Sequence, residues 1–210
     1  MTKHQQPKFI VIEGGEGAGK SSLIKALKEK LGDSVLLTRE PGGSSYAEAI
    51  RETALKHPLS KDAVAETMIC LMFAARFDHV EKLIKPALAK GQNVISDRFD
   101  ASSYAYQIHA QKGKHLEKLF WNLRSHISRK PDLYIYLDVD VEEGLRRARS
   151  RNSKNTEGNH FDDREVDFHK LLRKGYKIFL KKVPHVVIDA NRPFEEVKVE
   201  FLKTVEKLLT

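Results

Sequence analysis

The sequence predicts an α/β protein in which a five-stranded parallel sheet lies between layers of helices, a three-layer arrangement. Short apolar runs alternate with segments of helical periodicity, an order that is typical of β-α-β units. A chain of 210 residues can bury a substantial core. No repeat, low-complexity tract or linker divides it, so residues 1–210 are expected to form one domain, with residues 1–7 as a flexible polar leader.

Five apolar runs have the length and the β-branched and aromatic content of strands. They are residues 8–12, 34–38, 93–96, 133–138 and 185–188. Helical periodicity predicts helices at about 20–31, 44–55, 62–89, 101–110, 114–128, 141–150, 164–182 and 194–208. Pro86 is expected to bend or divide the third of these. Glu195 and Glu196 suit the positive end of the last one.

Composition narrows the possible partners. The net charge of +8 favours anionic ligands, either nucleic acid or a site that holds several phosphates. The arginines are scattered along the chain and then cluster at 146–151, which suits a folded cleft better than a disordered basic arm. No apolar run approaches the roughly 20 residues of a membrane span, and no signal peptide is visible. We expect a cytoplasmic protein, with its single cysteine, Cys70, buried as a small hydrophobe.

The most specific motif follows the first predicted strand. Residues 14–21 fit the pattern G-x-x-x-x-G-K-[ST] between an apolar strand and a helix. That geometry aims backbone N–H groups and a positive helix end at the phosphates of a nucleoside triphosphate. Lys20 can reach the outer phosphates, and the Ser21 hydroxyl can bind Mg²⁺. The expected phosphate-binding residues are Gly14, Gly15, Glu16, Gly17, Ala18, Gly19, Lys20, Ser21 and Ser22.

Charged residues follow the other predicted strands as well. Ligand sites in open α/β sheets lie beyond the carboxyl ends of the strands. The groups at those ends are 39–43, 97–100, Asp138 with Asp140, and 189–193. Beyond the fourth strand, residues 151–163 are rich in Asn, Ser and Gly and have arginines at both ends. We interpret about 150–164 as a mobile lid that could carry arginines onto phosphates.

Several motifs in order make the chain similar to a known family. They are residues 12–22, Thr38-Arg-Glu-Pro-Gly-Gly43, 73–76, 84–88, Asp97-Arg98 with 102–107, 131–138 and 163–165. In these the chain resembles the bacterial thymidylate kinases, which are P-loop nucleoside monophosphate kinases. The resemblance implies the P-loop NTPase fold and a homodimer. It also implies transfer of the γ-phosphoryl group of MgATP to dTMP, which gives ADP and dTDP for dTTP synthesis.

The resemblance also implies roles for individual residues. Catalytic roles fall to Lys20, Arg98, Asp97 and a lid arginine, either Arg164 or Arg151. Contacts to ATP beyond the phosphate loop would come from Arg149, Asn191 and Arg192. The acceptor nucleotide would be bound by Glu13, Glu16, Arg39, Pro41, Arg51, Met72, Phe73, Arg76, Arg98, Ser102, Ser103, Tyr106 and Gln107.

Base recognition departs from the family pattern. The family usually has a Phe four residues before the arginine of the third helix, whereas here Met72 is four and Phe73 three residues before Arg76. Either side chain could therefore contact the pyrimidine. This change keeps a related monophosphate kinase with another acceptor as an alternative. The basic charge keeps a nucleic-acid-binding ATPase as a weaker one, although no nucleic-acid-reading motif is present. We expect no stable nucleic-acid partner and no membrane association.

Overall fold

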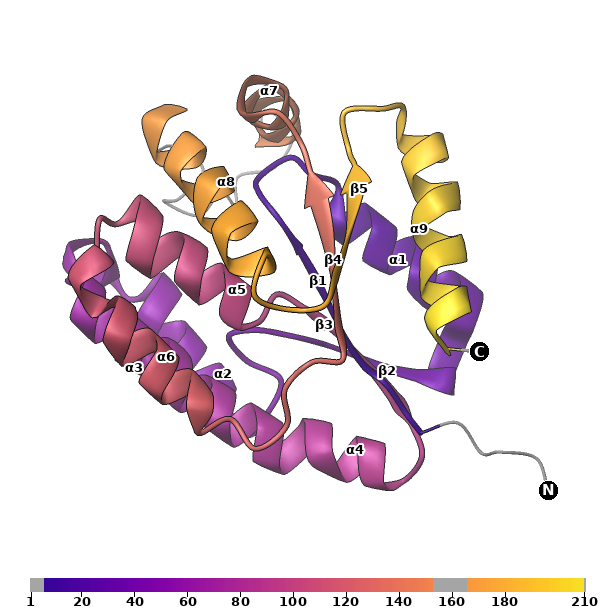
Figure 1. The fold of residues 1–210 in the computed structure, drawn as a ribbon, viewed down its shortest axis with the longest axis horizontal. Helices are drawn as coiled ribbons and strands as arrows, with labels where there is room; N and C mark the ends of the chain where they lie inside the picture. Colours follow the sequence, from indigo (N-terminus) through magenta and orange to yellow (C-terminus); the bar gives the residue numbers. More distant parts are fainter. Residues whose placement is uncertain (1–5, 153–165, 210) are drawn as a thin grey trace.

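The structure, a computed structural model, describes residues 6–152 and 166–209 (Figure 1). Most of the expected leader and of the expected lid lie outside these ranges, and so does Arg164. Of Arg151 only the backbone is described, at the end of a helix. Nothing in the structure therefore bears on the contribution of either lid arginine.

A five-stranded parallel sheet forms the middle layer, which confirms the predicted fold class. Its strand order is β2-β3-β1-β4-β5. The bounds are β1 Phe9–Gly14, β2 Val35–Arg39, β3 Asn93–Asp97, β4 Leu133–Asp138 and β5 His185–Asp189. All four pairings are parallel, so every strand ends at the same edge of the sheet. The chain passes from β1 to the edge strand β2, returns through β3 beside β1, and then crosses to β4 and β5 on the other side. The connections leave in opposite directions at β1, and this opens a crevice at that edge.

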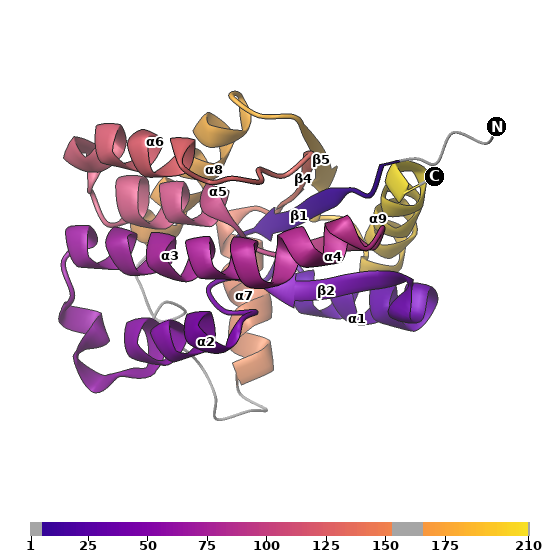
Figure 2. The same ribbon diagram turned by 90° about the horizontal axis from the view of Figure 1, so that it is seen from below.

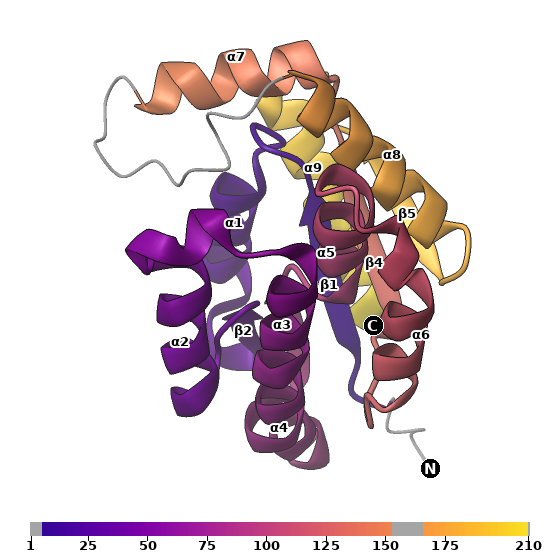
Figure 3. The same cartoon turned by 90° about the vertical axis from the view of Figure 1, so that its left-hand side faces the viewer.

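Helices cover both faces of the sheet (Figures 1, 2 and 3). One face carries α1 (Lys20–Leu31) and α9 (Phe194–Leu209). The other carries α3 (Ala65–His79), α4 (Lys85–Ala89), α5 (Asp100–Ser103), α6 (Glu117–Ser125) and α8 (Val166–Leu180). The short helix α2 (Ser45–Arg51) lies outside α3, and α7 (Val141–Asn152) lies beyond the strand ends.

Two apolar cores follow from the alternation of side chains along the strands. In β1, Phe9 and Val11 join the larger core under α3, α5, α6 and α8, whereas Ile10 and Ile12 join the core under α1 and α9. The strand is buried throughout. Burial on both faces explains why β1 reads as a continuous apolar run and not as an alternating one.

Three helices continue into π-helical turns, a feature that periodicity did not predict. These turns are Glu52–Lys56, Val80–Ile84 and Tyr104–Ala110; short 3-10 turns are Gly32–Ser34, Pro58–Asp62 and Lys114–Leu116. The predicted helix 62–89 therefore divides at Val80–Ile84. Pro86 lies in the first turn of α4, directly after the turn at which the helix divides.

The prediction that Cys70 is buried is wrong, since its side chain is exposed. On α3 the neighbouring Ile69, Met72 and Phe73 face inward. Residue 70 follows Ile69 by about 100° around the helix and so points to solvent. Among the helices that the structure describes, none combines the length and the apolar composition needed to cross a membrane.

Candidate active site

The phosphate loop joins β1 to α1 at the strand-end edge of the sheet. Gly19 precedes α1 in the left-handed region (φ 85°), which glycine adopts at little cost, and the first-turn N–H groups of α1 therefore point toward the loop. Lys20 is almost completely buried, and its Nζ donates to the carbonyl oxygens of Gly14 at 2.9 Å and Gly15 at 3.3 Å. Burial and the nearby Arg98 lower the pKa of Lys20. The loop thus has the shape and charge of a phosphate cradle.

The backbone of the loop packs directly on α7. A Cβ on Gly17, whose φ is 69°, would lie 2.0 Å from the carbonyl oxygen of Gly144 in α7. In return, a Cβ on Gly144 would lie 2.5 Å from the carbonyl oxygen of Glu16. Both positions therefore require glycine, because the two backbones touch. Helix α7, which carries the arginine cluster, is held against the phosphate loop by this contact.

The other expected ATP residues lie at the same edge. Asn191 follows β5 and bridges two loops, because its Oδ1 accepts from the Asp140 N–H at 2.9 Å and its Nδ2 donates to Asp189 at 2.8 Å. Arg192 pairs with Glu200 of α9. Arg149 is exposed on α7, and the side chains of Ser21 and Ser22 are exposed at the start of α1. Their contacts with a nucleotide remain predictions.

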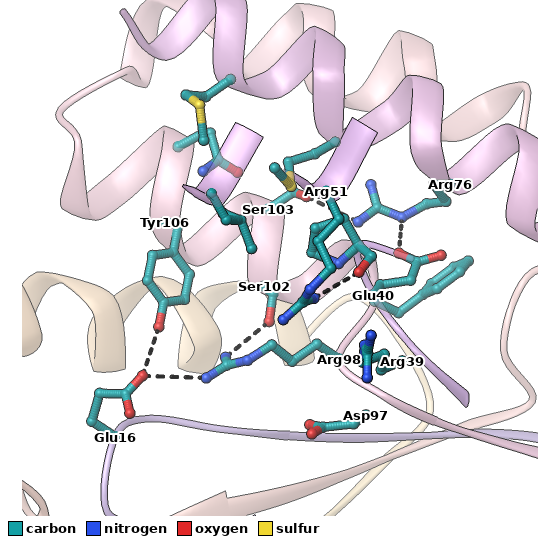
Figure 4. Close-up of a pocket in the computed structure, with 16 residues that line it drawn as sticks. Glu16, Arg39, Glu40, Arg51, Arg76, Asp97, Arg98, Ser102, Ser103 and Tyr106 are labelled. Atoms are coloured by element: carbon teal, nitrogen blue, oxygen red, sulfur yellow. Dashed lines mark hydrogen bonds and ion pairs between the residues drawn. The ribbon is translucent and has the colours of Figure 1, made fainter. Parts of the chain in front are cut away.

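A cavity of about 150 Å³ opens on the other side of the phosphate loop (Figure 4). It is built from the loop, the ends of β2 and β3, and helices α2, α3 and α5 with the turns that follow α2 and α5. Its walls are Glu16, Arg39, Glu40, Pro41, Arg51, Leu55, Met68, Met72, Arg76, Asp97, Arg98, Phe99, Ser102, Ser103, Tyr106 and Gln107. Eleven of the expected acceptor-binding residues, and also Asp97, are in this set.

Arg98 reaches into the cavity from the end of β3. Its Nη2 lies 3.4 Å from Glu16 Oε1, and Tyr106 Oη donates to the same oxygen at 3.4 Å (Figure 4). Its Nη1 donates to the Ser102 hydroxyl at 3.2 Å. Glu16 therefore belongs to both sites, because its backbone is part of the phosphate loop and its carboxylate faces the cavity.

Arg51 and Arg39 come from the opposite wall. The Nη1 of Arg51 donates to the Pro41 carbonyl at 2.7 Å, and burial lowers the pKa of Arg51. Arg39 is more exposed and pairs with Glu48 at 3.0 Å. The same glutamate accepts from the Gly43 N–H at 2.8 Å, which fastens the turn at 41–43 to α2. With Arg98, these residues bring three guanidinium groups to one cavity, as a polyanionic ligand requires.

Arg76 lies at the deep end of the cavity and is held from behind. Its Nε donates to Glu40 Oε2 at 2.7 Å and its Nη2 to the Ser103 hydroxyl at 3.0 Å. Glu40 Oε1 accepts from Nδ1 of the fully buried His79 at 3.0 Å. The other ring nitrogen, Nε2, hydrogen-bonds to the Thr38 hydroxyl at 2.8 Å. Thr38, His79 and Glu40 thus fix the direction of Arg76.

Three buried polar atoms of this wall have no protein partner among the described residues. They are Arg76 Nη1, Asp97 Oδ1 and Gln107 Oε1. Leaving such atoms unpaired costs about 1–3 kcal/mol each. A ligand with complementary donors and acceptors would supply their partners, so they mark where polar recognition can take place.

Phe73 and Glu13 do not line the cavity, contrary to expectation. Phe73 packs in the core against Phe120 at 5.5 Å and Phe77 at 5.9 Å, while Met72 lines the cavity beside Met68. Glu13 is buried behind the cavity, where it accepts from the Phe99 N–H at 2.9 Å. Burial raises the pKa of Glu13 to about 7, against the opposing effects of Arg98, Ser102, Phe99 and Lys20.

Four wall residues had no assigned role in the predicted site, namely Glu40, Leu55, Met68 and Phe99, although the strand-end groups 39–43 and 97–100 contain two of them. Glu40 and Phe99 directly adjoin expected residues at strand ends. Met68 is one helical turn before Met72 on α3. Helical spacing could therefore have indicated Met68, whereas no sequence signal distinguishes Leu55 from a core leucine.

The protein offers only some of the oxygen ligands that a Mg²⁺ ion at the phosphate loop would need. The structure shows no group of three or more His, Cys, Asp or Glu side chains that could hold a metal, for the residues it describes. Mg²⁺ usually keeps water and binds through one or two protein oxygens and the phosphates of its substrate. The exposed Ser21 hydroxyl and the half-buried Asp97 carboxylate at this edge fit that mode.

The strand order, the phosphate loop and the adjoining basic cavity define a P-loop nucleotide-binding protein with a second site for an anionic ligand. Comparisons with known proteins refine this class. The family model described as thymidylate kinase matches residues 12–201, and the chain belongs to the thymidylate kinase family. The comparisons thus confirm the resemblance drawn from the motifs.

Individual relatives agree over nearly the whole chain. The thymidylate kinase of Rhodopseudomonas palustris (strain BisB18) is 42% identical, over 96% of this chain and 90% of the relative. That of Shouchella clausii (strain KSM-K16) is 39% identical, over 96% and 95%. Among solved structures, a crystal structure of thymidylate kinase from Ehrlichia chaffeensis superposes with a TM-score of 0.72 at 27% identity, and the match covers 96% of this chain and 99% of that one.

Proposed function

We propose that this chain is a dTMP kinase that transfers the γ-phosphoryl group of ATP to dTMP and releases ADP and dTDP. Membership of the family supports the activity. The observation that carries the proposal is the shared wall at Glu16, which has a triphosphate cradle on one side and an arginine-lined cavity on the other. In this geometry two nucleotides would meet end to end at the sheet edge.

In the reaction, an oxygen of the acceptor phosphate attacks the γ-phosphorus, and the bond from that phosphorus to the β–γ bridging oxygen breaks. The protein's task is to position and neutralise two polyanions. On the donor side, Lys20 and the amides of 15–21 would hold the ATP phosphates. Asn191, Arg192 and Arg149 would border the adenine.

On the acceptor side, Arg98 and Arg51 would bind the phosphate, with Arg39 at the mouth of the cavity. The sugar would lie against Glu16 and Tyr106. The unpaired Nη1 of Arg76 and Oε1 of Gln107 would pair with a base carbonyl and a base N–H. These two atoms match the O4 and N3–H of thymine in hydrogen-bonding sense. The other base contacts would come from Ser102, Ser103, Pro41 and Met72.

Bound Mg²⁺ would neutralise charge on the transferred group, held by Ser21 and the ATP phosphates, with Asp97 nearby. A lid arginine, Arg164 or Arg151, would also neutralise negative charge in the transition state. Arg164 lies outside the described residues, and the side chain of Arg151 is not described.

We further propose a homodimer in the cytoplasm. The dimer is proposed from the family resemblance. Light scattering of the protein as it elutes from a size-exclusion column would test it by measuring the molar mass. A reducing compartment suits the exposed thiol of Cys70, which would be prone to oxidation elsewhere.

The proposal is tested by ADP release with a panel of acceptors: dTMP, dUMP, dCMP, dGMP and thymidine. We expect dTMP to give the highest kcat/KM. Preference for another monophosphate would refute dTMP specificity and favour a related kinase. We consider that alternative because methionines line the cavity wall. No acceptor-dependent ADP release, together with salt-dependent DNA binding, would favour the nucleic-acid-binding ATPase.

A further inference from the structure

Helix α8 contributes a buried hydroxyl to the cavity's central arginine. Tyr176 is fully buried, and its Oη accepts from Arg98 Nη1 at 2.8 Å, which is the shortest of the three contacts of that nitrogen. The other two are Ser102 Oγ at 3.2 Å and the Gly14 carbonyl at 3.3 Å. Tyr176 itself does not line the cavity.

The preceding residue explains how Tyr176 comes so close. Gly175 faces the turn that follows α5, where a Cβ would lie 2.8 Å from the Cα of Ala105. A larger residue would push α8 away from the sheet edge. Glycine therefore allows the backbones to touch and brings the Tyr176 hydroxyl to the end of β3.

The hydrogen bonds around Tyr176 have one consistent direction. Ser102 Oγ donates its proton to Glu13 Oε2 at 2.7 Å, and so it can only accept from Tyr176 Oη at 2.8 Å. Tyr176 then donates to Ser102 and accepts from Arg98. Burial raises the pKa of Tyr176 well above its usual range, so the hydroxyl keeps the proton that it donates. The chain runs from the guanidinium through two hydroxyls to a buried carboxylate.

Arg98 needs such support because its backbone is in the left-handed region, with φ 68°. That conformation is costly for a residue with a long side chain and persists only where the surroundings fix it. The Arg98 N–H donates to the Ile12 carbonyl at 2.9 Å, which holds the backbone. Tyr176, Ser102 and Gly14 hold the guanidinium end.

The ring and the hydroxyl of Tyr176 do different things. The ring packs on Tyr136 of β4, with the centroids 5.3 Å apart, and this contact attaches α8 to the sheet. The hydroxyl hydrogen-bonds to Arg98 and to Ser102. A phenylalanine would keep the packing and remove the hydrogen bonds, so the two effects are separable by one substitution.

We propose that the Tyr176 hydroxyl is a positioning group that directs Arg98 toward the phosphate of the acceptor, and that it thereby determines selectivity for a nucleoside monophosphate over the nucleoside. This inference rests on the proposed function only in placing a phosphate beside Arg98. It adds a residue from the far end of the chain to phosphate recognition, without any contact between that residue and the ligand.

The test compares binding of dTMP with binding of thymidine by titration calorimetry, in wild type and Tyr176→Phe. Loss of a hydrogen bond to a charged group should weaken dTMP binding about tenfold. Thymidine, which lacks the phosphate, should change by less than about twofold. The matched control is Tyr46→Phe, because Tyr46 is exposed and its affinities should equal those of wild type. Equal weakening of both ligands, or no change in either, would overturn the proposal.

A double-mutant cycle supplies the second criterion. If Tyr176 acts through Arg98, then Tyr176→Phe should cost nothing further in an Arg98→Ala background. Additive losses would contradict the proposal. The comparison depends on the phosphate and not on the base. If the wild type preferred another monophosphate, dTMP specificity would fail, while the same cycle with that nucleotide and its nucleoside would still decide the role of Tyr176.

Discussion

The substitution His79→Leu tests whether the buried polar cluster behind the cavity fixes the direction of Arg76. His79 hydrogen-bonds to Glu40 at 3.0 Å and to Thr38 at 2.8 Å, and it is fully buried. Leucine has a similar volume but no polar atoms. The substitution therefore leaves one carboxylate oxygen and one hydroxyl without their partner, and it lets Glu40 turn away from the geometry that holds Arg76.

The cost to stability can be estimated from those two contacts. An unsatisfied buried group costs about 1–3 kcal/mol, with charged groups at the upper end. Glu40 is buried and forms an ion pair with Arg76, whereas Thr38 is only partly buried. We expect a total of about 3 kcal/mol. For a domain of this size, 1 kcal/mol shifts Tm by about 2–4 °C, so Tm should fall by about 6–12 °C.

Acceptor selectivity gives a second readout that loss of packing alone would not change. 5-Methyl-dCMP carries an amino group where thymine has a carbonyl, so a fixed donor from Arg76 should reject it. The ratio of kcat/KM for dTMP to that for 5-methyl-dCMP should fall at least tenfold in His79→Leu. The matched control is His115→Leu, because His115 is exposed and pairs with Glu66 at the surface. A Tm loss below about 2 °C, or an unchanged ratio, would refute the positioning role.

Three further outcomes are expected. Lys20→Ala should lower kcat by about a hundredfold to a thousandfold with an unchanged circular dichroism spectrum, and near-normal turnover would contradict its phosphate role. Gly144→Ala should raise KM for both nucleotides, because the added Cβ would lie 2.5 Å from the Glu16 carbonyl oxygen and would push the phosphate loop away. A change in KM for only one nucleotide would argue against the shared wall. Glu13 holds its proton more tightly in the folded state, with a pKa of about 7 against 4.5, so its contribution to stability should fall by about 3 kcal/mol as pH rises from 4.5 to 7. Urea unfolding of wild type and Glu13→Gln at pH 5 and pH 8 measures this difference, and equal pH dependence would refute it.

The sequence was sufficient for the sheet and for the side chains at its edge, because each depends on local patterns. An apolar run predicts a strand, a parallel sheet collects strand ends, and the glycine pattern of the phosphate loop is specific. Lys20, Asp97 and Arg98 could be predicted in this way. The supporting residues could not, since Glu40 and His79 meet across 39 positions and Arg98 and Tyr176 across 78.

The choice between Met72 and Phe73 shows the limit at one helix. Neighbouring residues differ by about 100° around an α-helix, so the rotation of α3 decides which one faces the cavity. That rotation is set by packing of Phe73 on Phe120, a residue of another helix. The same rotation exposes Cys70. Helical periodicity gave the existence of α3, while its orientation needed the tertiary structure.

At position 98 the left-handed backbone favours glycine, whereas binding of a phosphate requires a cationic side chain. Glycine would relax the main chain but supply no cation, and alanine would keep the torsional penalty without the charge. We therefore expect Arg98→Gly to be the more thermostable of the two and both to lack the phosphate anchor. A replacement at position 98 that raises thermal stability would therefore remove the phosphate-binding cation. A more heat-resistant variant has to keep Arg98 and its backbone strain.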